Sequence, residues 1–235
     1  MKIEPEIHKW KVDLCLEGIY YHSASNYLKT AKTHYGPLKQ IIDTIFDIDK
    51  KIKRVEAKYE NKLDAYNETE SFCIQLDSFY SEMTGKYLPV IRDIALVHIL
   101  NALCLEAYVN KIALNRLNPK SSFEDFDRLS LEGKWFFLPS LIKGHRTFDK
   151  GTSVFQGFKN IIKRRNNLVH FKGKNEDWRG YLPPQFFEDL GLKIEYAQES
   201  CSTVKNMIRK LCEYCSMAIP KWLDVNFINV FELIS

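Results

Sequence analysis

Residues 89–115 read PVIRDIALVHILNALCLEAYVNKIALN, and this stretch decides the fold class. Its length and strongly apolar character predict one helix from Tyr87 to about Asn115 at the centre of the core. One face of this helix carries a stripe of small and apolar side chains, at Ala95, Ile99, Ala102, Val109 and Ala113. Small residues allow a second helix to approach closely, so a helical bundle is expected around this segment.

The rest of the chain has the same helical character. Its 235 residues contain 10 glycines and 8 prolines, few for a sandwich or barrel that needs many turns. Breaks are predicted at Tyr35-Gly36-Pro37, at Thr84-Gly85 and over residues 144–151, and residues 175–192 are expected to form a long connector. An all-α helical bundle follows, with further helices predicted over residues 6–32, 38–82, 129–142, 153–171 and 193–218.

Three segments are expected along the chain. Residues 1–85 form N-terminal helices that either extend the bundle or complete it, and residues 86–218 form its core. Within the first segment, Ile45, Ile48 and Ile52 repeat at helical spacing and predict an amphipathic packing helix. Residues 219–235 are an apolar tail that must pack on the bundle or meet a partner.

Composition indicates an ordinary cytoplasmic protein. The first residues, MKIEPEIHKWKVDL, lack the apolar region of a secretory signal, and no apolar run is expected to reach the roughly 18 residues of a membrane span. The six cysteines are scattered through helical segments, so no disulfides are predicted.

Cofactor and metal motifs are absent from the sequence. Cys212 and Cys215 form a lone C-x-x-C without a second pair, and the six histidines show no metal-ligand spacing. No P-loop or dinucleotide-binding glycine pattern occurs. Neither a metal nor a cofactor is therefore expected. The aromatic run Trp135-Phe136-Phe137 is interpreted as core packing rather than base stacking.

Positive charge is concentrated in one segment. The formal net charge is only +4, but six Lys or Arg and no Asp or Glu lie between Lys159 and Lys174. Such a patch attracts nucleic-acid phosphates. A solvated basic helix end, favoured by the helix dipole, explains the same pattern, and both interpretations stay open.

Arg165 interrupts an apolar stripe formed by Phe155, Phe158, Ile162 and Val169. Because a buried guanidinium needs a partner, this position must open onto a polar crevice or meet an acidic group. Glu106 is the candidate acidic partner, with Asn110 one turn further along the same helix. A locally solvated Glu106 is the alternative.

His170 follows Asn166 by four residues, which places the two side chains on one helix face. Arg165 is about 140° from His170 on an ideal helix, and its long side chain would have to reach back toward it. A polar trio at the helix end is therefore permitted. The alternative is that His170 only caps the last turn.

These segments together resemble the HEPN superfamily. The resemblance is carried by LEAYVN at residues 105–110, GKWFFLPSLIKGHRTFDKG at 133–151 and VFQGFKNIIKRRNNLVHFK at 154–172, the last with the Arg, polar residue, spacer and His that mark the superfamily. It covers residues 87–174 and a last helix. It implies a helical bundle that commonly dimerises so that two Arg-x4-His motifs face one cleft, and in many members metal-independent RNA cleavage.

On this chain the resemblance implies acid–base work by His170, stabilisation of phosphate charge by Arg165 and orientation of the pair by Asn166. RNA would be attracted by Lys163, Arg164, Lys172 and Lys174. The expected protein is a homodimeric endoribonuclease in a toxin or defence setting, with an antitoxin or regulator as a possible partner. A non-catalytic RNA-binding or assembly module, or a helical scaffold, remains the alternative.

Overall fold

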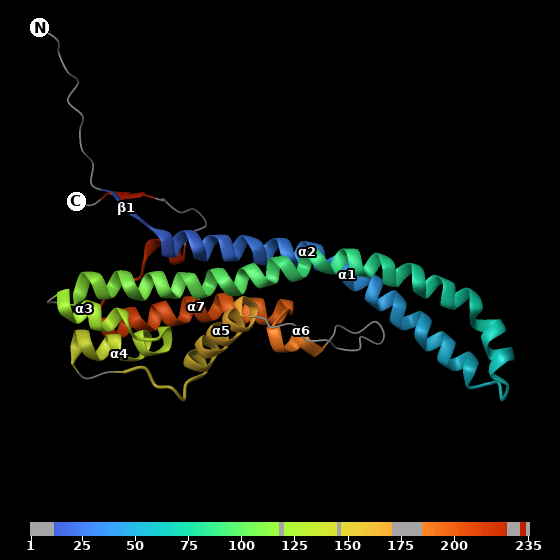
Figure 1. Cartoon of the computed structure of the whole chain (residues 1–235). Coiled ribbons are helices and arrows are strands. Elements are labelled where there is room, and N and C mark those ends of the chain that lie inside the picture. Colours follow the sequence, from blue (N-terminus) through green and yellow to red (C-terminus); the bar gives the residue numbers. More distant parts are fainter. Residues whose placement is uncertain (1–11, 118–119, 145–146, 171–184, 225–230, 234–235) are drawn as a thin grey trace, which may run out of the picture. The chain divides into compact units, whose positions relative to one another are not determined.

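A computed structural model describes residues 12–117, 120–144, 147–170, 185–224 and 231–233. Within these ranges the chain is all-α, as predicted, with two three-residue strands that pair antiparallel, Val12 opposite Leu233. The elements are β1 (Val12–Leu14), α1 (Leu16–Glu56), α2 (Lys62–Arg116), α3 (Lys120–Asp127), α4 (Leu131–Lys143), α5 (Ser153–Val169), α6 (Gln185–Leu190), α7 (Ile194–Cys215), a 3-10 turn (Lys221–Leu223) and β2 (Phe231–Leu233) (Figure 1).

Two compact units divide the chain, and each is described on its own. The aromatic unit comprises residues 1–24, 100–160 and 201–235, and the hairpin unit comprises residues 25–99 and 161–200. Helices α1, α2, α5 and α7 contribute residues to both units.

Trp135 of α4 is the centre of the aromatic unit. Its side chain is fully buried, and its indole Nε1–H donates to the carbonyl of Leu105 on α2 at 3.2 Å. The rings of Tyr108, Phe148 and Phe158 surround it with centroid distances of 5.8 to 6.3 Å. The interpretation of Trp135 as a packing residue is therefore confirmed, because a buried indole with a bonded N–H cannot stack on a base.

The C-x-x-C pair also belongs to this core. Cys212 and Cys215 are both buried, and the Cys212 sulfur lies 3.2 Å from the Tyr108 hydroxyl. Burial raises the pKa of the Cys215 thiol to about 11. Thiols of this kind stay protonated and behave as small apolar side chains.

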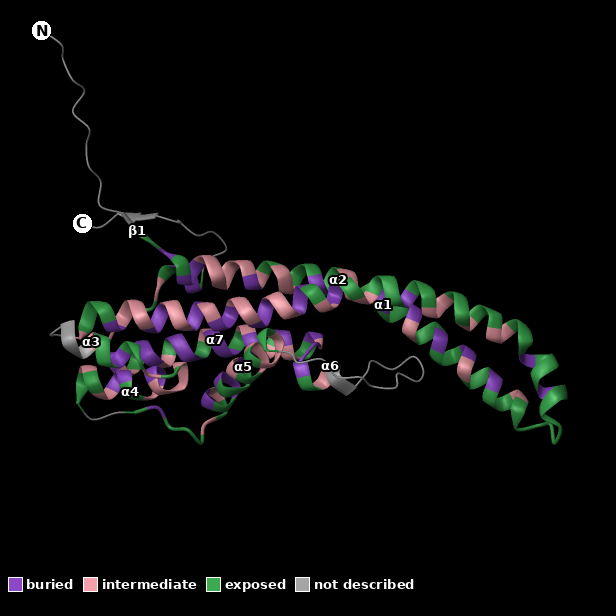
Figure 2. Cartoon of the chain, viewed as in Figure 1, coloured by how far each residue is buried: buried purple, intermediate pink, exposed green. Residues whose placement is uncertain are grey.

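The hairpin unit is built on the later part of α1 and the first part of α2, which run antiparallel (Figure 1). Buried side chains recur along α1 at spacings of three and four, at Ile41, Ile45, Ile48 and Ile52. They form the purple stripe that Figure 2 shows along this helix. The imidazole of His34 on α1 lies 3.1 Å from the buried carboxylate of Asp93 on α2.

Two predicted helix breaks are wrong. α1 continues through Pro37, and α2 continues through Gly85 and Pro89, so the expected boundary at residue 85 falls inside a helix. An internal proline costs about 3 kcal/mol and an internal glycine about 1 kcal/mol. Here Leu38 and Ile41 after Pro37, and Met83 and Val90 around Gly85, are all buried. Burial of this repeated apolar face outweighs the local penalties.

Other segments differ from expectation in detail. Residues 120–127 form α3, a helix that the sequence did not predict, and the N-cap of α4 is Ser130, whose hydroxyl accepts the Gly133 N–H at 3.1 Å. The end of the expected connector forms α6, and the segment before it, residues 171–184, lies outside the described residues. In the apolar tail, Trp222 and Leu223 are buried, and the Trp222 carbonyl lies 2.8 Å from Nε2 of His22.

The expectation that no apolar run approaches the length of a membrane span is wrong for α2. Within the described residues it is the one helix long and apolar enough to cross a membrane, and half of its most apolar window is buried inside the protein. A core helix of a soluble protein passes the same test, so this property alone does not indicate a membrane span.

The hairpin packing predicts unequal effects at two adjacent positions of α1. Ile45 is fully buried, whereas Phe46 is 50% exposed. Ile45→Ala should lower the free energy of unfolding by about 2–4 kcal/mol because it opens a cavity. Phe46→Ala, the matched control, should change it by less than about 1 kcal/mol. Urea unfolding measures both, and equal effects would contradict the assigned packing face.

Candidate functional site

The predicted catalytic residues lie at the C-terminal end of α5 in the hairpin unit: Arg165 and Asn166 are in its last turns, and His170 follows its last residue, Val169. Arg165 is partly buried, and its Nη1–H donates to Oδ1 of Asn166 at 3.0 Å. The backbone N–H of His170 donates to the carbonyl of Asn166 at 2.9 Å. Asn166 therefore connects the arginine through its side chain and the histidine through its backbone. The structure thus joins the side chains of Arg165 and Asn166, whereas His170 is linked to Asn166 only by an ordinary backbone helix bond.

Two of the three predicted catalytic side chains are open to solvent. Asn166 and His170 are exposed, and the exposed Lys163 lies one turn before Asn166 on the same face. This gives a polar stripe of Lys163, Asn166 and His170 that a substrate could reach. Lys172 and Lys174, which were predicted to bind RNA, lie outside the described residues.

Arg164 has a different environment from the neighbouring Arg165. Its side chain is 12% exposed, and its Nη2–H donates to Oε2 of Glu199 on α7 at 3.0 Å. Its guanidinium lies 4.4 Å from the ring centroid of Tyr196, in cation–π geometry. Arg164 was predicted to contact RNA, but this arginine is already paired within the protein. Its charge is neutralised by Glu199.

Arg164 also packs against the turn that ends α6. Gly191 has φ of +72°, the left-handed conformation that favours glycine. Its N–H donates to the Glu188 carbonyl, and the Leu192 N–H donates to the Phe187 carbonyl, which is the Schellman pattern. A Cβ at Gly191 would lie 2.7 Å from Cδ of Arg164. Both the conformation and the close contact thus require glycine.

His98 of α2 holds the same turn from another side. The imidazole is fully buried, and its Nε2 lies 2.9 Å from the Gly191 carbonyl. Because a carbonyl only accepts, Nε2 carries the proton, while the buried Nδ1 has no hydrogen-bond partner among the described residues. Burial lowers the pKa of His98 to about 4, and the hydrogen bond to Gly191 opposes this shift. The ring is therefore neutral at pH 7.

Asn167 adds a further contact between α5 and α6. Its side-chain N–H donates to the Asp189 carbonyl at 3.1 Å. Arg164 and Asn167 are three residues apart and share the inward face of α5. The exposed polar stripe of Lys163, Asn166 and His170 lies about 100° around the helix from this inward face.

The expected apolar stripe on α5 is wrong at its last position. Phe155, Phe158 and Ile161 are fully buried, but Val169 is 51% exposed. The buried face rotates from these residues toward Arg164, because an ideal helix turns 100° per residue and spacings of three drift away from a straight line.

The supporting residues Glu106 and Asn110 lie in the aromatic unit. Asn110 Oδ1 accepts a hydrogen bond from the Lys134 ammonium at 3.0 Å, and Asp127 accepts another at 2.7 Å. Lys134 is only 5% exposed, so Asn110 serves to satisfy a buried charge. Glu106 is partly buried, and because it belongs to a different unit from Arg165 their pairing stays a prediction.

Sequence reasoning missed the network of His98, Gly191 and Glu199. One signal was present: Arg164 continues the spacing of three set by Phe155, Phe158 and Ile161, so its inward direction follows from the helix period. No signal marked its partners, which are brought together from α6 and α7 by tertiary structure.

The Gly191 turn predicts opposite effects of alanine at two glycines of the hairpin unit. Gly191→Ala should lower the free energy of unfolding by about 2 kcal/mol or more, because φ is positive and the methyl group meets Arg164. Gly85→Ala is the control, since a Cβ there has open space within a helix, and it should raise stability by up to about 1 kcal/mol. A destabilised Gly85→Ala or a neutral Gly191→Ala in urea unfolding would contradict the turn geometry.

His98 predicts a loss of stability in mild acid. The unfolded chain takes up a proton near the ordinary pKa of 6.5, whereas the folded chain does so only near 4. Stability is therefore present above pH 6.5 and is lost as pH falls toward 4, by on the order of 2 kcal/mol between pH 7 and 5.

His98→Gln keeps an N–H donor but does not titrate, so it should flatten the pH dependence of the unfolding free energy. His170→Gln changes an exposed histidine and should leave that dependence as in the unsubstituted chain. A pH profile that His98→Gln does not change would show that other groups cause the acid sensitivity.

Comparison with known proteins gave no match to a family model, to a curated protein or to a solved structure.

Proposed function

We propose that this chain is a metal-independent endoribonuclease of HEPN type whose catalytic residues are Arg165, Asn166 and His170. One observation carries the proposal: the three residues occupy one exposed helix end and Asn166 holds the Arg165 guanidinium at 3.0 Å, while the adjacent Arg164 is tied to Glu199. An arginine with only a structural role would be expected to pair with an acidic residue, as Arg164 does with Glu199.

The proposed reaction uses the ordinary chemistry of these groups. The imidazole of His170 takes the proton of a ribose 2′-hydroxyl, and the 2′-oxygen attacks the adjacent phosphorus. The bond to the 5′-oxygen breaks, leaving a 2′,3′-cyclic phosphate and a 5′-hydroxyl that receives a proton. Arg165 stabilises the charge that builds on the phosphate oxygens, for which its planar guanidinium has matched donors.

A homodimer would supply both proton-transfer groups. One histidine can act as base and the other as acid when two copies of the α5 end face one cleft. Lys163 would attract the RNA backbone without reading its sequence. The proposed setting is the cytoplasm, in a toxin or defence role controlled by an antitoxin or other regulator.

The test is cleavage of a labelled RNA by the purified full-length chain in EDTA. Cleavage should yield cyclic-phosphate ends, and a 2′-deoxy residue at the cleaved position should block it. His170→Ala and Arg165→Ala should each lower the rate at least about 100-fold. Arg128→Ala is the control. That side chain is 81% exposed, lies in the segment between α3 and α4 and belongs to the aromatic unit, so the variant should cleave at the unsubstituted rate.

Two results would overturn the proposal. Cleavage that persists in His170→Ala would point to a contaminant or to another site. RNA binding without cleavage, combined with loss of the dimer in Arg165→Ala by sedimentation, would instead support the non-catalytic assembly module.

A further inference from the structure

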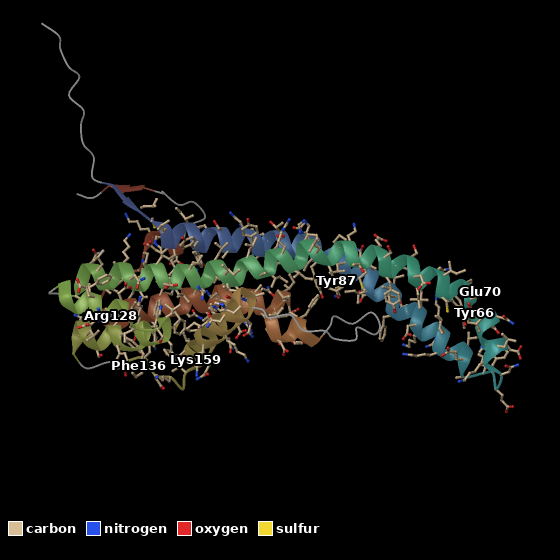
Figure 3. The ribbon with its side chains drawn as sticks, viewed as in Figure 1. Tyr66, Glu70, Tyr87, Arg128, Phe136 and Lys159 are labelled. Atoms are coloured by element: carbon tan, nitrogen blue, oxygen red, sulfur yellow. The ribbon has the colours of Figure 1, made fainter. Side chains whose placement is uncertain are left out.

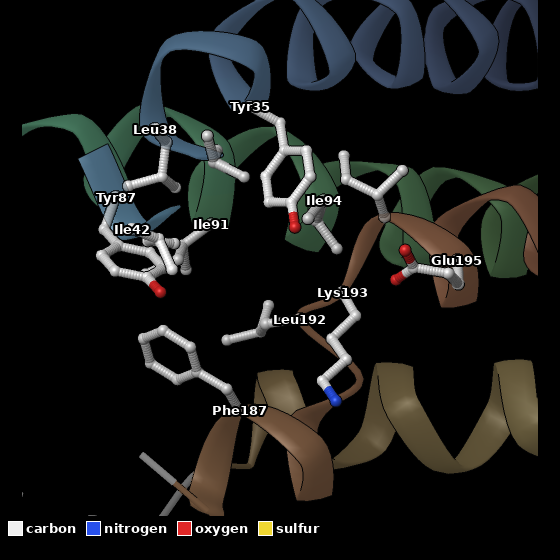
Figure 4. A pocket seen from close by; sticks show the side chains of 12 residues that line it. Tyr35, Leu38, Ile42, Tyr87, Ile91, Ile94, Phe187, Leu192, Lys193 and Glu195 are labelled. Carbon is white, nitrogen blue, oxygen red and sulfur yellow. The ribbon is translucent and has the colours of Figure 1, made fainter. Parts of the chain in front are cut away.

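A cavity of about 340 Å³ lies within the hairpin unit, apart from the polar stripe on α5. Side chains from α1, α2, α6 and the start of α7 line it, and most of them are apolar (Figure 4). Ligand pockets in proteins range from about 300 to 1,000 Å³ and are mainly apolar with a few placed polar groups. The cavity has the volume for a small ligand of one or two rings.

The hydroxyl of Tyr87 is the polar group in this cavity that lacks a hydrogen-bond partner among the described residues, and its oxygen is buried. Figure 4 shows this hydroxyl directed into the cavity, with the Tyr35 hydroxyl also pointing inward from α1. Leaving a buried hydroxyl without a partner is costly, and native structures have few such groups. A bound molecule with its own hydrogen-bonding group would satisfy it.

The electrostatics of the cavity disfavour an anion, and its mainly apolar lining disfavours any charged molecule. Burial raises the pKa of Tyr87 to about 12, with a contribution from Tyr35, so its phenol stays neutral. Burial also raises the pKa of Tyr35, and the carboxylates of Glu195 and Asp43 raise it further, which marks a site unfavourable for an anion. Lys193 at the rim is already paired with Glu188 on α6 and offers no spare positive charge.

We propose that this cavity binds a small, uncharged and mostly apolar molecule that carries one hydroxyl or equivalent group hydrogen-bonded to Tyr87. The inference is independent of RNA cleavage, because none of the lining residues belongs to the Arg165, Asn166 and His170 trio. Its ligand is defined by chemistry: a flat or compact apolar body with one neutral hydrogen-bonding group.

Calorimetric titration of the full-length chain with naphthalene-based probes tests the proposal. 2-Naphthol should bind about tenfold more tightly than naphthalene, because it alone satisfies the Tyr87 hydroxyl. The anion 2-naphthoate and the cation 2-naphthylmethylammonium should bind more weakly than 2-naphthol. Failure of 2-naphthol to bind, or preference for a charged probe, would overturn the assignment.

Three variants localise the binding. Tyr87→Phe should make 2-naphthol and naphthalene bind equally, and it should not destabilise the empty chain because the lost hydroxyl had no partner. Ile91→Trp should weaken binding of every probe at least tenfold by filling the cavity. Tyr66→Phe is the matched control on α2, 55% exposed and labelled in Figure 3, and should bind as the unsubstituted chain does.

A result in which Tyr87→Phe retains the preference for 2-naphthol would show that the hydroxyl is recognised elsewhere. Circular dichroism of each variant confirms that it is folded before titration. If Ile91→Trp is unfolded, the Tyr87→Phe comparison still decides the proposal.

Discussion

The contact between Arg164 and the turn at Gly191 organises the described part of the hairpin unit. Glycine permits the left-handed turn that ends α6, and its missing Cβ leaves room for the arginine side chain. The turn carbonyl is held by His98 of α2, and the guanidinium continues to Glu199 of α7. The glycine turn at the end of α6 thus contacts α2 through His98 and α5 through Arg164, and Arg164 in turn contacts α7. A substitution that distorts this turn would disturb the packing of all four helices.

This arrangement explains how neighbouring arginines acquire different roles. Successive residues on a helix point about 100° apart, so Arg164 and Arg165 cannot face the same neighbour. Arg164 is directed toward α6 and α7, where an acidic partner compensates its charge. Arg165 points about 100° away from Arg164, and among the described residues its guanidinium donates to Asn166 on its own helix. The proposed catalytic residue Arg165 therefore lies on a helix that Arg164 anchors to α6 and α7.

Much of the fold follows from the sequence. The apolar pattern of α2, the isoleucine repeat of α1 and the aromatic run of α4 each indicate helices and their buried faces. The breaks at Pro37 and Gly85 were misplaced because local propensity is a small term beside the burial of a continuous apolar face. The site was partly predictable. Arg165 and Asn166 are adjacent near the end of α5 and His170 follows its last residue, so the sequence alone places them close, whereas His98, Gly191 and Glu199 come from separate segments that only folding brings together.

The central claim is that Arg164 pairs with Glu199 and Arg165 does not. Two double-mutant cycles in the free energy of unfolding test it most directly. The first cycle combines Arg164→Met with Glu199→Gln, and the second combines Arg165→Met with the same Glu199→Gln. A coupling of about 1 kcal/mol is predicted for the first, since the pair is only partly buried, and none for the second. Coupling of Glu199 to Arg165, or none to Arg164, would contradict the account.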